Sequence, residues 1–324
     1  MDDLILGGLY VYGVMLFAAV LRPPVRNLAM ALAAMLPLRL FCLGLRISLG
    51  SDVPAYTTVL QQCDLSAINA LELFWPMACL PSAYLSDLFP FPFFWIGLID
   101  CVLFALIARL GGLRIAALHD LVYLLSTSMG AIRQALAMKL VLLAVLLYVA
   151  NRKKRGRSGG LLVLTAPFVH LAAVVPAAAM KFMTSGLLVR LVLIAAPLLL
   201  GSMLIDEALL SKLMFYMQFE GFRSAQEIYA SWAKRFVVIA GSLTLTAPNG
   251  LYWGVYSIGM VFAAAEFQLP EIAVRVGAYF EQFEVLLIGA PMKPHLRRLG
   301  ILWYGLIALA YTARYMINIA GLPR

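Results

Sequence analysis

Residues 128–140 read SMGAIRQALAMKL, an apolar run that carries an arginine, Arg133, near its start. The apolar character continues to residue 150, which gives the run the length of a bilayer-spanning helix, about 20 residues. An arginine inside hydrocarbon costs about 3 kcal/mol on insertion scales, so it usually faces a cavity, an ionic partner or the membrane interface. The stretch therefore predicts a membrane helix that carries a charge for a structural or functional reason.

The composition of the whole chain is that of a membrane protein. Of its 324 residues, 63% are hydrophobic and 13% are charged, and the mean hydropathy is +0.92, outside the usual range of soluble proteins. Apolar runs of about 17–22 residues recur between residues 4 and 318. The sequence predicts an all-α fold, a single polytopic integral membrane domain (1–324) of about 10–12 transmembrane or re-entrant helices.

Charge and motifs exclude several classes of function. The formal net charge is +9, but the basic residues cluster at the ends of apolar runs, as the positive-inside rule produces. We therefore expect no nucleic-acid partner. The patterns GxxxxGK[ST], GxGxxG, HExxH and GxSxG are missing, and the four cysteines lack metal-ligand spacing, so we expect neither a cofactor nor a metal.

The basic run RKKRGR, residues 152–157, anchors the membrane topology. Five of its six residues are basic, so the run should be cytoplasmic. The span at 131–150 then runs inward, and Arg133 lies near its outer end.

Residues 48–92 are expected on the outer face. Counting from the basic turn at 22–26, the span 28–47 runs outward. The number of membrane crossings counted from this turn agrees with the number counted back from RKKRGR only if the apolar stretch 67–86 does not cross the membrane. That stretch contains a glutamate and two prolines, which suit a broken or re-entrant helix better than a straight span.

A second adjustment concerns residues 161–182. The cluster KPHLRR, residues 293–298, should be cytoplasmic, and counting back from it makes 206–233 an outer-face loop. The crossings counted from RKKRGR and from KPHLRR agree if residues 161–182 enter the membrane and return to the same side. The helix would then be broken near its two prolines, and His170 would lie at the outer turn. The short stretch 234–247 is the other place where the number of membrane crossings could change.

The expected loop 206–233 is rich in aromatic residues, which could stack on sugar rings or belong to an interfacial amphipathic helix.

With this threading, polar residues in or beside the apolar runs collect near the outer face. They are Arg39, Arg46, Asp52, Tyr56, Glu72, Arg133, His170, Arg275 and Tyr279. Guanidinium groups bind phosphate oxygens in pairs and stay charged at physiological pH, and a carboxylate or histidine can take a proton from a hydroxyl. Several arginines facing an outward-open apolar cavity would suit a diphosphate carried on a lipid.

Structural interpretations stay open for several of these residues. Arg39 could snorkel or pair with an acid. Asp100 and Asp120 lie in spans without an obvious partner, and a buried structural pair, or Asp120 beside His119, suits them better than catalysis. The two tyrosines could belong to the interfacial aromatic belt.

The order of the motifs resembles the EpsG family, which belongs with the Wzy-type polymerases of O-antigen and exopolysaccharide. The resemblance covers roughly residues 40–285 and joins motifs that are each short but occur in the same order. The motifs are GSDVPAY (50–56), the segment headed by Glu72, SMGAIRQALA (128–137), the basic turn, FVH (168–170) and RVGAYF (275–280).

The resemblance implies a GT-C-like glycosyltransferase of the bacterial inner membrane, with its active site facing the periplasm. It would transfer a growing glycan from undecaprenyl diphosphate to the non-reducing end of another lipid-linked repeat unit. Its partners would be the two lipid-linked oligosaccharides, the bilayer and a separate chain-length regulator, and the reaction would need no metal.

The resemblance also implies roles for individual residues. Arg133 would hold the donor diphosphate. His170 would activate the acceptor hydroxyl or, alternatively, bind the diphosphate, and Asp52 is the second candidate for the base. The expected substrate-binding residues are Arg39, Arg46, Tyr56, Glu72, Arg275 and Tyr279.

Two other functions stay open. An O-antigen ligase would use the same donor and a similar set of arginines and histidine, but ligases commonly carry a larger outer loop than 206–233. A flippase for lipid-linked sugars would need polar residues along a path through the membrane and pseudo-repeated halves, and the sequence has neither.

Overall fold

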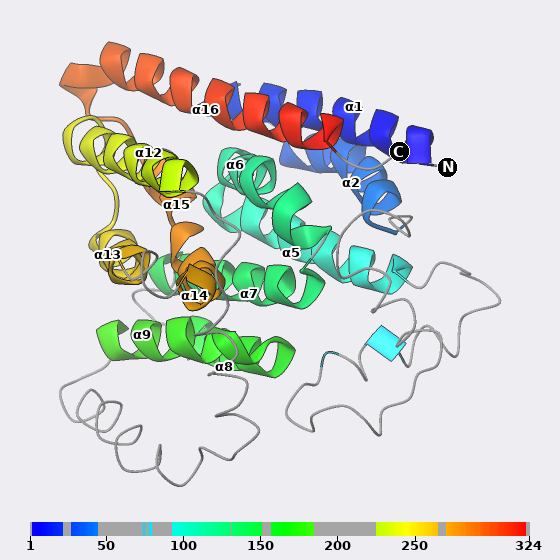
Figure 1. The fold of residues 1–324 in the computed structure, drawn as a ribbon, viewed down its shortest axis with the longest axis horizontal. Coiled ribbons are helices and arrows are strands. Elements are labelled where there is room, and N and C mark those ends of the chain that lie inside the picture. The colour runs from blue at the N-terminus through cyan, green and yellow to red at the C-terminus, as the bar shows by residue number, and fades with distance from the viewer. Residues whose placement is uncertain are drawn as a thin grey trace, which may run out of the picture. The chain divides into compact units, whose positions relative to one another are not determined.

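The computed structural model describes residues 2–21, 27–44, 74, 78–79, 93–129, 131–150, 157–184, 225–264 and 270–321. Within these ranges the regular structure is helical, and the only β-type pairing is an isolated bridge between Thr246 and Met292 (Figure 1). The all-α fold predicted from the sequence is confirmed for this part of the chain.

Three helices in the described ranges are long and apolar enough to cross a membrane. They are α1 (Asp2–Leu21), α5 (Phe94–Gly111) and α7 (Ile132–Ala150). Three shorter apolar helices are α2 (Leu28–Gly44), α9 (Val174–Thr184) and α13 (Gly250–Ala264). Large apolar side chains such as Met30 and Leu306 are exposed, which fits surfaces that face lipid. The predicted membrane helical bundle is confirmed.

The chain forms two compact units, one of Met1–Leu171 with Ile301–Arg324 and one of Ala172–Gly300. Besides α1, α2, α5 and α7, the first unit contains α6 (Leu113–Tyr123), the π-helical turn η1 (Leu124–Ser128), α8 (Arg157–Val169) and most of α16 (Arg297–Ala320). Besides α9 and α13, the second contains α12 (Ala225–Thr244), α14 (Pro270–Glu281), α15 (Glu284–Ile288) and the 3₁₀ turn η5 (Pro294–Leu296).

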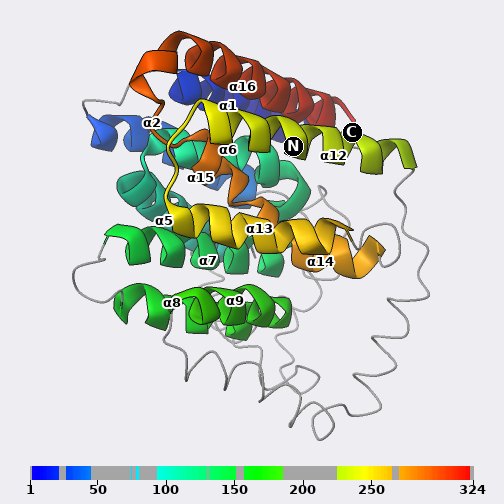
Figure 2. The ribbon, with the colours of Figure 1, turned by 90° about the vertical axis from the view of Figure 1, so that its left-hand side faces the viewer.

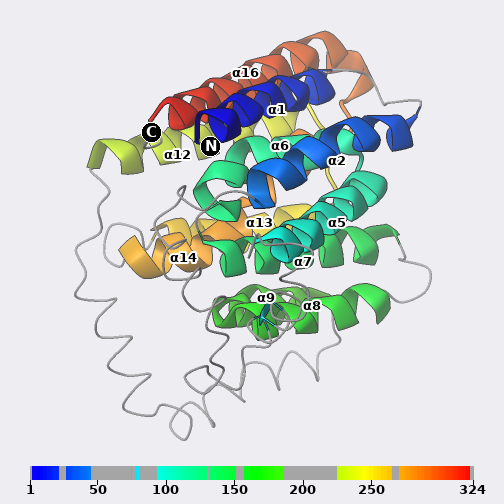
Figure 3. The ribbon, with the colours of Figure 1, turned by 90° about the vertical axis from the view of Figure 1, so that its right-hand side faces the viewer.

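In the first unit, α1 and α16 lie side by side and run antiparallel (Figure 3). The Tyr304 hydroxyl donates to the carbonyl of Val20 over 3.0 Å, and the Tyr315 hydroxyl donates to that of Leu9 over 3.2 Å. The end of α1 therefore meets the beginning of α16. The guanidinium of Arg114, at the start of α6, lies 5.5 Å from the centre of the Tyr304 ring at the same end of the unit.

The end of α2 meets the beginning of α5. A Cβ added to Gly44 would lie 3.7 Å from the Cα of Phe94, and one added to Gly97 would touch Leu40 and Leu43. The end of α2 and the beginning of α5 therefore lie at the same end of the first unit. Of the segment 48–92, which we expect on the outer face, the structure describes only Phe74, Ala78 and Cys79, and these are helical.

A glycine turn reverses the chain between α5 and α6. Gly112 has φ 93° and ψ 152°, a region that essentially only glycine occupies because a Cβ would clash there. The turn allows α6 to pack back on α5.

Helices α7 and α8 pack extensively against each other in the first unit. Only residues 151–156 connect them, and the two helices lie side by side in all three views. Since so short a connection cannot return along the roughly 28 Å of α7, the helices run antiparallel. A Cβ on Gly159 would lie 2.6 Å from the carbonyl oxygen of Ala144 and 3.0 Å from the amide nitrogen of Tyr148. The small residue thus allows the two backbones to touch.

The second unit is organised around α13, which packs against α9, α14 and α15 (Figure 2). A Cβ on Gly259 would clash with the Cβ of Phe280, so α13 and α14 also approach closely at a glycine. The rings of Phe262 and Phe280 stack with centroids 5.4 Å apart.

Two expected segments have different bounds in the structure. The helix α12 begins at Ala225, inside the loop expected at 206–233, and ends at Thr244. Most of the short stretch 234–247 therefore belongs to a helix of 20 residues. Its polar and aromatic first half explains the difference, because AQEIYASW is not apolar enough to be read as part of a span. In 161–182, the α-helical path breaks at His170 and the 3₁₀ turn η3 (Leu171–Ala173) precedes α9. The re-entrant path itself stays a prediction.

We expect Gly112→Ala to destabilise the first unit by about 1–3 kcal/mol, since alanine is strained at this positive φ. The measurement is the Tm of the detergent-purified protein, followed by fluorescence-detected gel filtration. The control is Gly305→Ala, where the added methyl group meets open space on α16. Equal Tm values for the two variants would contradict the structural role of the turn.

We also expect Gly159→Ala to lower the Tm, because its methyl group must push α8 away from the backbone of α7. The adjacent Gly160→Ala is the matched control, since nothing lies within 4 Å of its added Cβ and alanine favours a helix. If Gly160→Ala destabilises as much as Gly159→Ala, the close packing of the two helices is wrong.

Candidate functional site

The α7–α8 pair brings Arg133 and His170 to one end of the first unit. Arg133 is the second residue of α7, and His170 follows the last residue of α8. Measured from the basic connection at 151–156, Arg133 lies about 26 Å along α7 and His170 about 20 Å along α8. Both residues are half-buried. The antiparallel pair therefore carries both residues at the end away from the basic connection.

The turn before Arg133 is unusual. Residues Leu124–Ser128 form the π-helical turn η1, closed by a 2.9 Å hydrogen bond in which the Met129 N–H donates to the Leu124 carbonyl, five residues earlier. Such π-turns occur frequently at functional sites. The first turn of α7 follows at once, and the partial positive charge of a helix N-terminus favours an anion there. An arginine at this position can therefore assist in binding phosphate oxygens.

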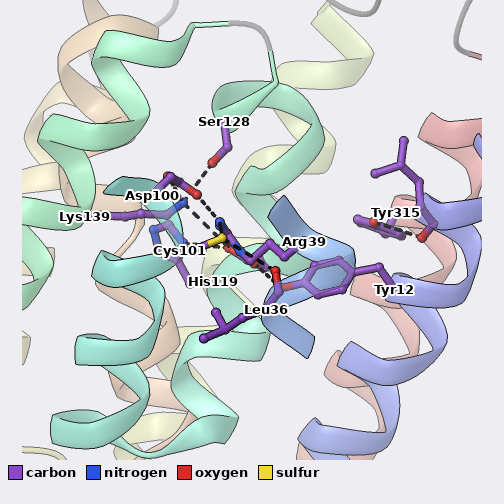
Figure 4. A network of polar contacts seen from close by, with 11 residues as sticks. Tyr12, Leu36, Arg39, Asp100, Cys101, His119, Ser128, Lys139 and Tyr315 are labelled. Carbon is purple, nitrogen blue, oxygen red and sulfur yellow. Dashed lines mark hydrogen bonds and ion pairs between the residues drawn. The ribbon is translucent and has the colours of Figure 1, made fainter. Parts of the chain in front are cut away.

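A buried ionic network joins the helices of the same unit (Figure 4). Arg39 of α2 donates to Asp120 of α6 through Nε, over 2.8 Å, and through Nη2, over 3.1 Å, and it also pairs with Asp100 of α5. Lys139 of α7 donates to the second oxygen of Asp100 over 2.6 Å. Two cations and two carboxylates thus balance, and all four residues are 0–3% exposed.

Neutral groups complete the network. The Tyr12 hydroxyl of α1 donates to Asp120 over 2.8 Å, and Lys139 donates to the Ser128 hydroxyl over 3.0 Å. His119 Nδ1 lies 4.0 Å from an Asp120 oxygen. The network therefore connects α1, α2, α5, α6, η1 and α7.

The network decides between alternatives that the sequence leaves open. Asp100 and Asp120 share two cations as buried structural residues, and Arg39 has the acidic partners that were one of its two interpretations. All three guanidinium nitrogens of Arg39 face carboxylates, and its side chain has no exposed surface. These contacts do not support the substrate-binding role expected for Arg39, which stays a prediction. Lys139 was missed, although a lysine in an apolar run with two acids in neighbouring spans is a signal for pairing.

The second unit holds a separate polar cluster around the RVGAYFEQF motif. Lys234 Nζ of α12 lies 3.1 Å from both carboxylate oxygens of Glu284, and Arg235 pairs with Glu281. The Arg235 guanidinium also lies 5.6 Å from the ring centre of Trp232. Ion pairs between α12 and the end of α14 and start of α15 therefore stabilise this unit, and the sequence interpretation included none of the four charged residues.

Tyr279 lies inside the second unit rather than on its surface. Its side chain is fully buried in α14, and its carbonyl accepts a 2.9 Å hydrogen bond from the Gln282 side chain. Arg275 lies on the same helix, five residues after its first residue. The substrate-binding roles of both residues stay predictions.

Four expected site residues, Arg46, Asp52, Tyr56 and Glu72, lie outside the described residues. Among those that are described, no group of three or more His, Cys, Asp or Glu side chains is arranged to hold a metal ion.

Comparison with known families decides the relationship that the motifs suggest. The profile of the EpsG family matches residues 30–323, nearly the whole chain. The chain belongs to the EpsG family. Searches of curated proteins and of solved structures returned no match. Membership of the EpsG family, together with the apolar helices, supports a membrane protein with a polysaccharide-polymerase type of function.

We expect Asp120→Asn to destabilise the first unit by about 3–5 kcal/mol, because the two buried cations, Arg39 and Lys139, would then share the single carboxylate of Asp100. The Tm in detergent measures the effect. Asp3→Asn, the same change at an exposed position of α1, is the control and should leave the Tm unchanged. A small effect of Asp120→Asn, equal to that of the control, would contradict the network.

Proposed function

We propose that this EpsG-family protein polymerises lipid-linked oligosaccharides. It transfers a growing glycan from undecaprenyl diphosphate to the non-reducing end of another lipid-linked repeat unit, as a GT-C-like glycosyltransferase of the bacterial inner membrane. The active site faces the periplasm, and a separate chain-length regulator acts with it.

One observation carries the proposal beyond the family match. The antiparallel α7–α8 pair has a run of basic residues, 152–157, at one end and Arg133 and His170 at the other. Since basic connections lie on the cytoplasmic side, the end with Arg133 and His170 is the outer one. Lipid-linked repeat units are presented to a periplasmic enzyme at that side of the membrane.

The chemistry needs two groups at this end. The acceptor hydroxyl attacks the anomeric carbon of the donor glycan, the bond from that carbon to the phosphate oxygen breaks, and undecaprenyl diphosphate leaves with the bonding electrons. Arg133 stabilises the charge that develops on the diphosphate, where a fixed cation acts most strongly in a site shielded from water. His170 accepts the proton of the hydroxyl, with Asp52 as the second candidate for this role.

The remaining candidates complete the proposed site. Arg275 or Arg46 acts as the second diphosphate clamp, while Glu72 and Tyr56 shape the sugar pocket or orient the arginines. The reaction is driven by a lipid diphosphate as leaving group, so it uses no nucleotide sugar.

The test is polymerisation of purified lipid-linked repeat units by the full-length protein in nanodiscs. We expect wild type to form a ladder of lipid-linked oligomers. Arg133→Ala should lower the rate by about 100-fold or more, as removal of a charge-stabilising group does, and Arg133→Lys should recover only part of the loss. His170→Gln should also lower the rate, and gel filtration verifies that each variant is folded.

The matched control is Arg109→Ala, which removes an exposed arginine from the last turn of α5. It should polymerise like wild type. A ladder that is unchanged in Arg133→Ala would exclude the proposed clamp. If wild type forms no ladder but transfers glycan to a lipid A core acceptor, the protein is a ligase; if it does neither but moves the lipid across a vesicle membrane, it is a flippase.

A further inference from the structure

Ser128, the first residue of SMGAIRQALAMKL, and Lys139, its next-to-last residue, are joined through their side chains. Lys139 Nζ donates to the hydroxyl oxygen of Ser128 over 3.0 Å (Figure 4). Ser128 is 2% exposed and Lys139 is fully buried. The hydrogen bond therefore closes a loop of the chain in which Arg133 lies almost midway.

The lysine end of this bond is held firmly. Lys139 Nζ lies 2.6 Å from Asp100 and 3.9 Å from Asp120, both of which also pair with Arg39. A buried ammonium with these partners has little freedom to move, because leaving the carboxylates would cost it charge compensation. Ser128 is thus bonded to a fixed point of the bundle.

The serine end lies where the backbone is least regular. Ser128 is the last residue of the π-helical turn η1, and the adjacent Met129 N–H closes that turn on Leu124. A π-turn is less favourable than an α-helical turn and needs support from its surroundings. The Lys139–Ser128 bond supplies support from α7, the helix that the turn leads into.

The bond is not needed for charge balance. Arg39 and Lys139 already balance Asp100 and Asp120, so the neutral Ser128 adds only a geometric restraint. Four residues separate Ser128 from Arg133, and Lys139 lies about 9 Å farther along α7. The restraint therefore acts on both sides of the arginine.

We propose that Ser128 and Lys139 are positioning residues that hold the π-turn and the first turn of α7, and through them the Arg133 side chain, in the orientation that binds the phosphate group of its ligand. The inference rests on the proposed function only for the identity of that ligand, a lipid-linked diphosphate. The restraint itself belongs to the fold of the first unit.

A distance measurement tests the restraint without using activity. Spin labels are attached at Ala131→Cys and Phe168→Cys, near the ends of α7 and α8, after the four native cysteines are replaced by alanine. Double electron–electron resonance in nanodiscs should give one narrow distance distribution. Ser128→Ala should broaden or split the distribution while the ion pairs stay intact, and Ser128→Thr, which keeps the hydroxyl, should restore it.

The matched control for loss of a hydroxyl is Thr312→Ala in α16, where the side chain donates to Ala308 of its own helix over 2.8 Å. It should leave the distribution unchanged. An unchanged distribution in Ser128→Ala, or an equal broadening in Thr312→Ala, would overturn the inference.

Kinetics distinguish positioning from stability alone. In the polymerisation assay, Ser128→Ala should lower kcat about tenfold and leave KM for the lipid-linked donor unchanged, because a misplaced clamp loses mainly transition-state interactions. Ser128→Thr should recover the rate. A kcat equal to that of wild type would overturn the positioning role. If wild type itself shows no polymerisation, the proposed function fails, and the distance distributions still decide whether Ser128 and Lys139 hold this turn.

Discussion

The first unit depends on the pairing of Arg39 and Lys139 with Asp100 and Asp120. Each of these four charges lies in an apolar helix that could not carry it alone, because an unpaired charge away from water costs several kcal/mol. The four residues come from α2, α5, α6 and α7, and Tyr12 adds α1. The helices must therefore pack so that these charges meet. In a membrane, where lipid is as apolar as the helices, this pairing gives a specificity that hydrophobic burial cannot provide.

The same network connects structure to the proposed activity. Lys139 lies on α7 and bonds to Ser128, which ends the π-turn from which α7 starts, so the interior of the bundle is coupled to the turn that carries Arg133. The close backbone contact at Gly159 sets α8 beside α7 and brings His170 to the same end. The packed interior can thus hold Arg133 and His170 in a fixed position at one end of the first unit. An enzyme requires such fixed positions when a cation must face a charge that develops only in the transition state.

Some features of the site could be predicted from sequence and others could not. Arg133 and His170 were chosen as candidates because polar and charged residues in apolar runs are rare, and their common end followed from the basic connection between the two helices. Their roles stay predictions. The partners of Arg39 were not assigned, since Asp100 and Asp120 are 61 and 81 residues away and spacing along one helix says nothing about such contacts. The cluster of Lys234, Arg235, Glu281 and Glu284 was missed for the same reason.

The sequence by itself determined the all-helical membrane fold, because hydropathy and span length are local properties that any bilayer imposes on each segment separately. It also determined the family, because short motifs keep their order along the chain. Only the tertiary structure decided which charges are paired, where a π-turn replaces an α-helical one, and where α12 begins. These features depend on contacts between residues far apart in the chain, and the free energy of such contacts is decided by packing and by the exclusion of water rather than by local composition.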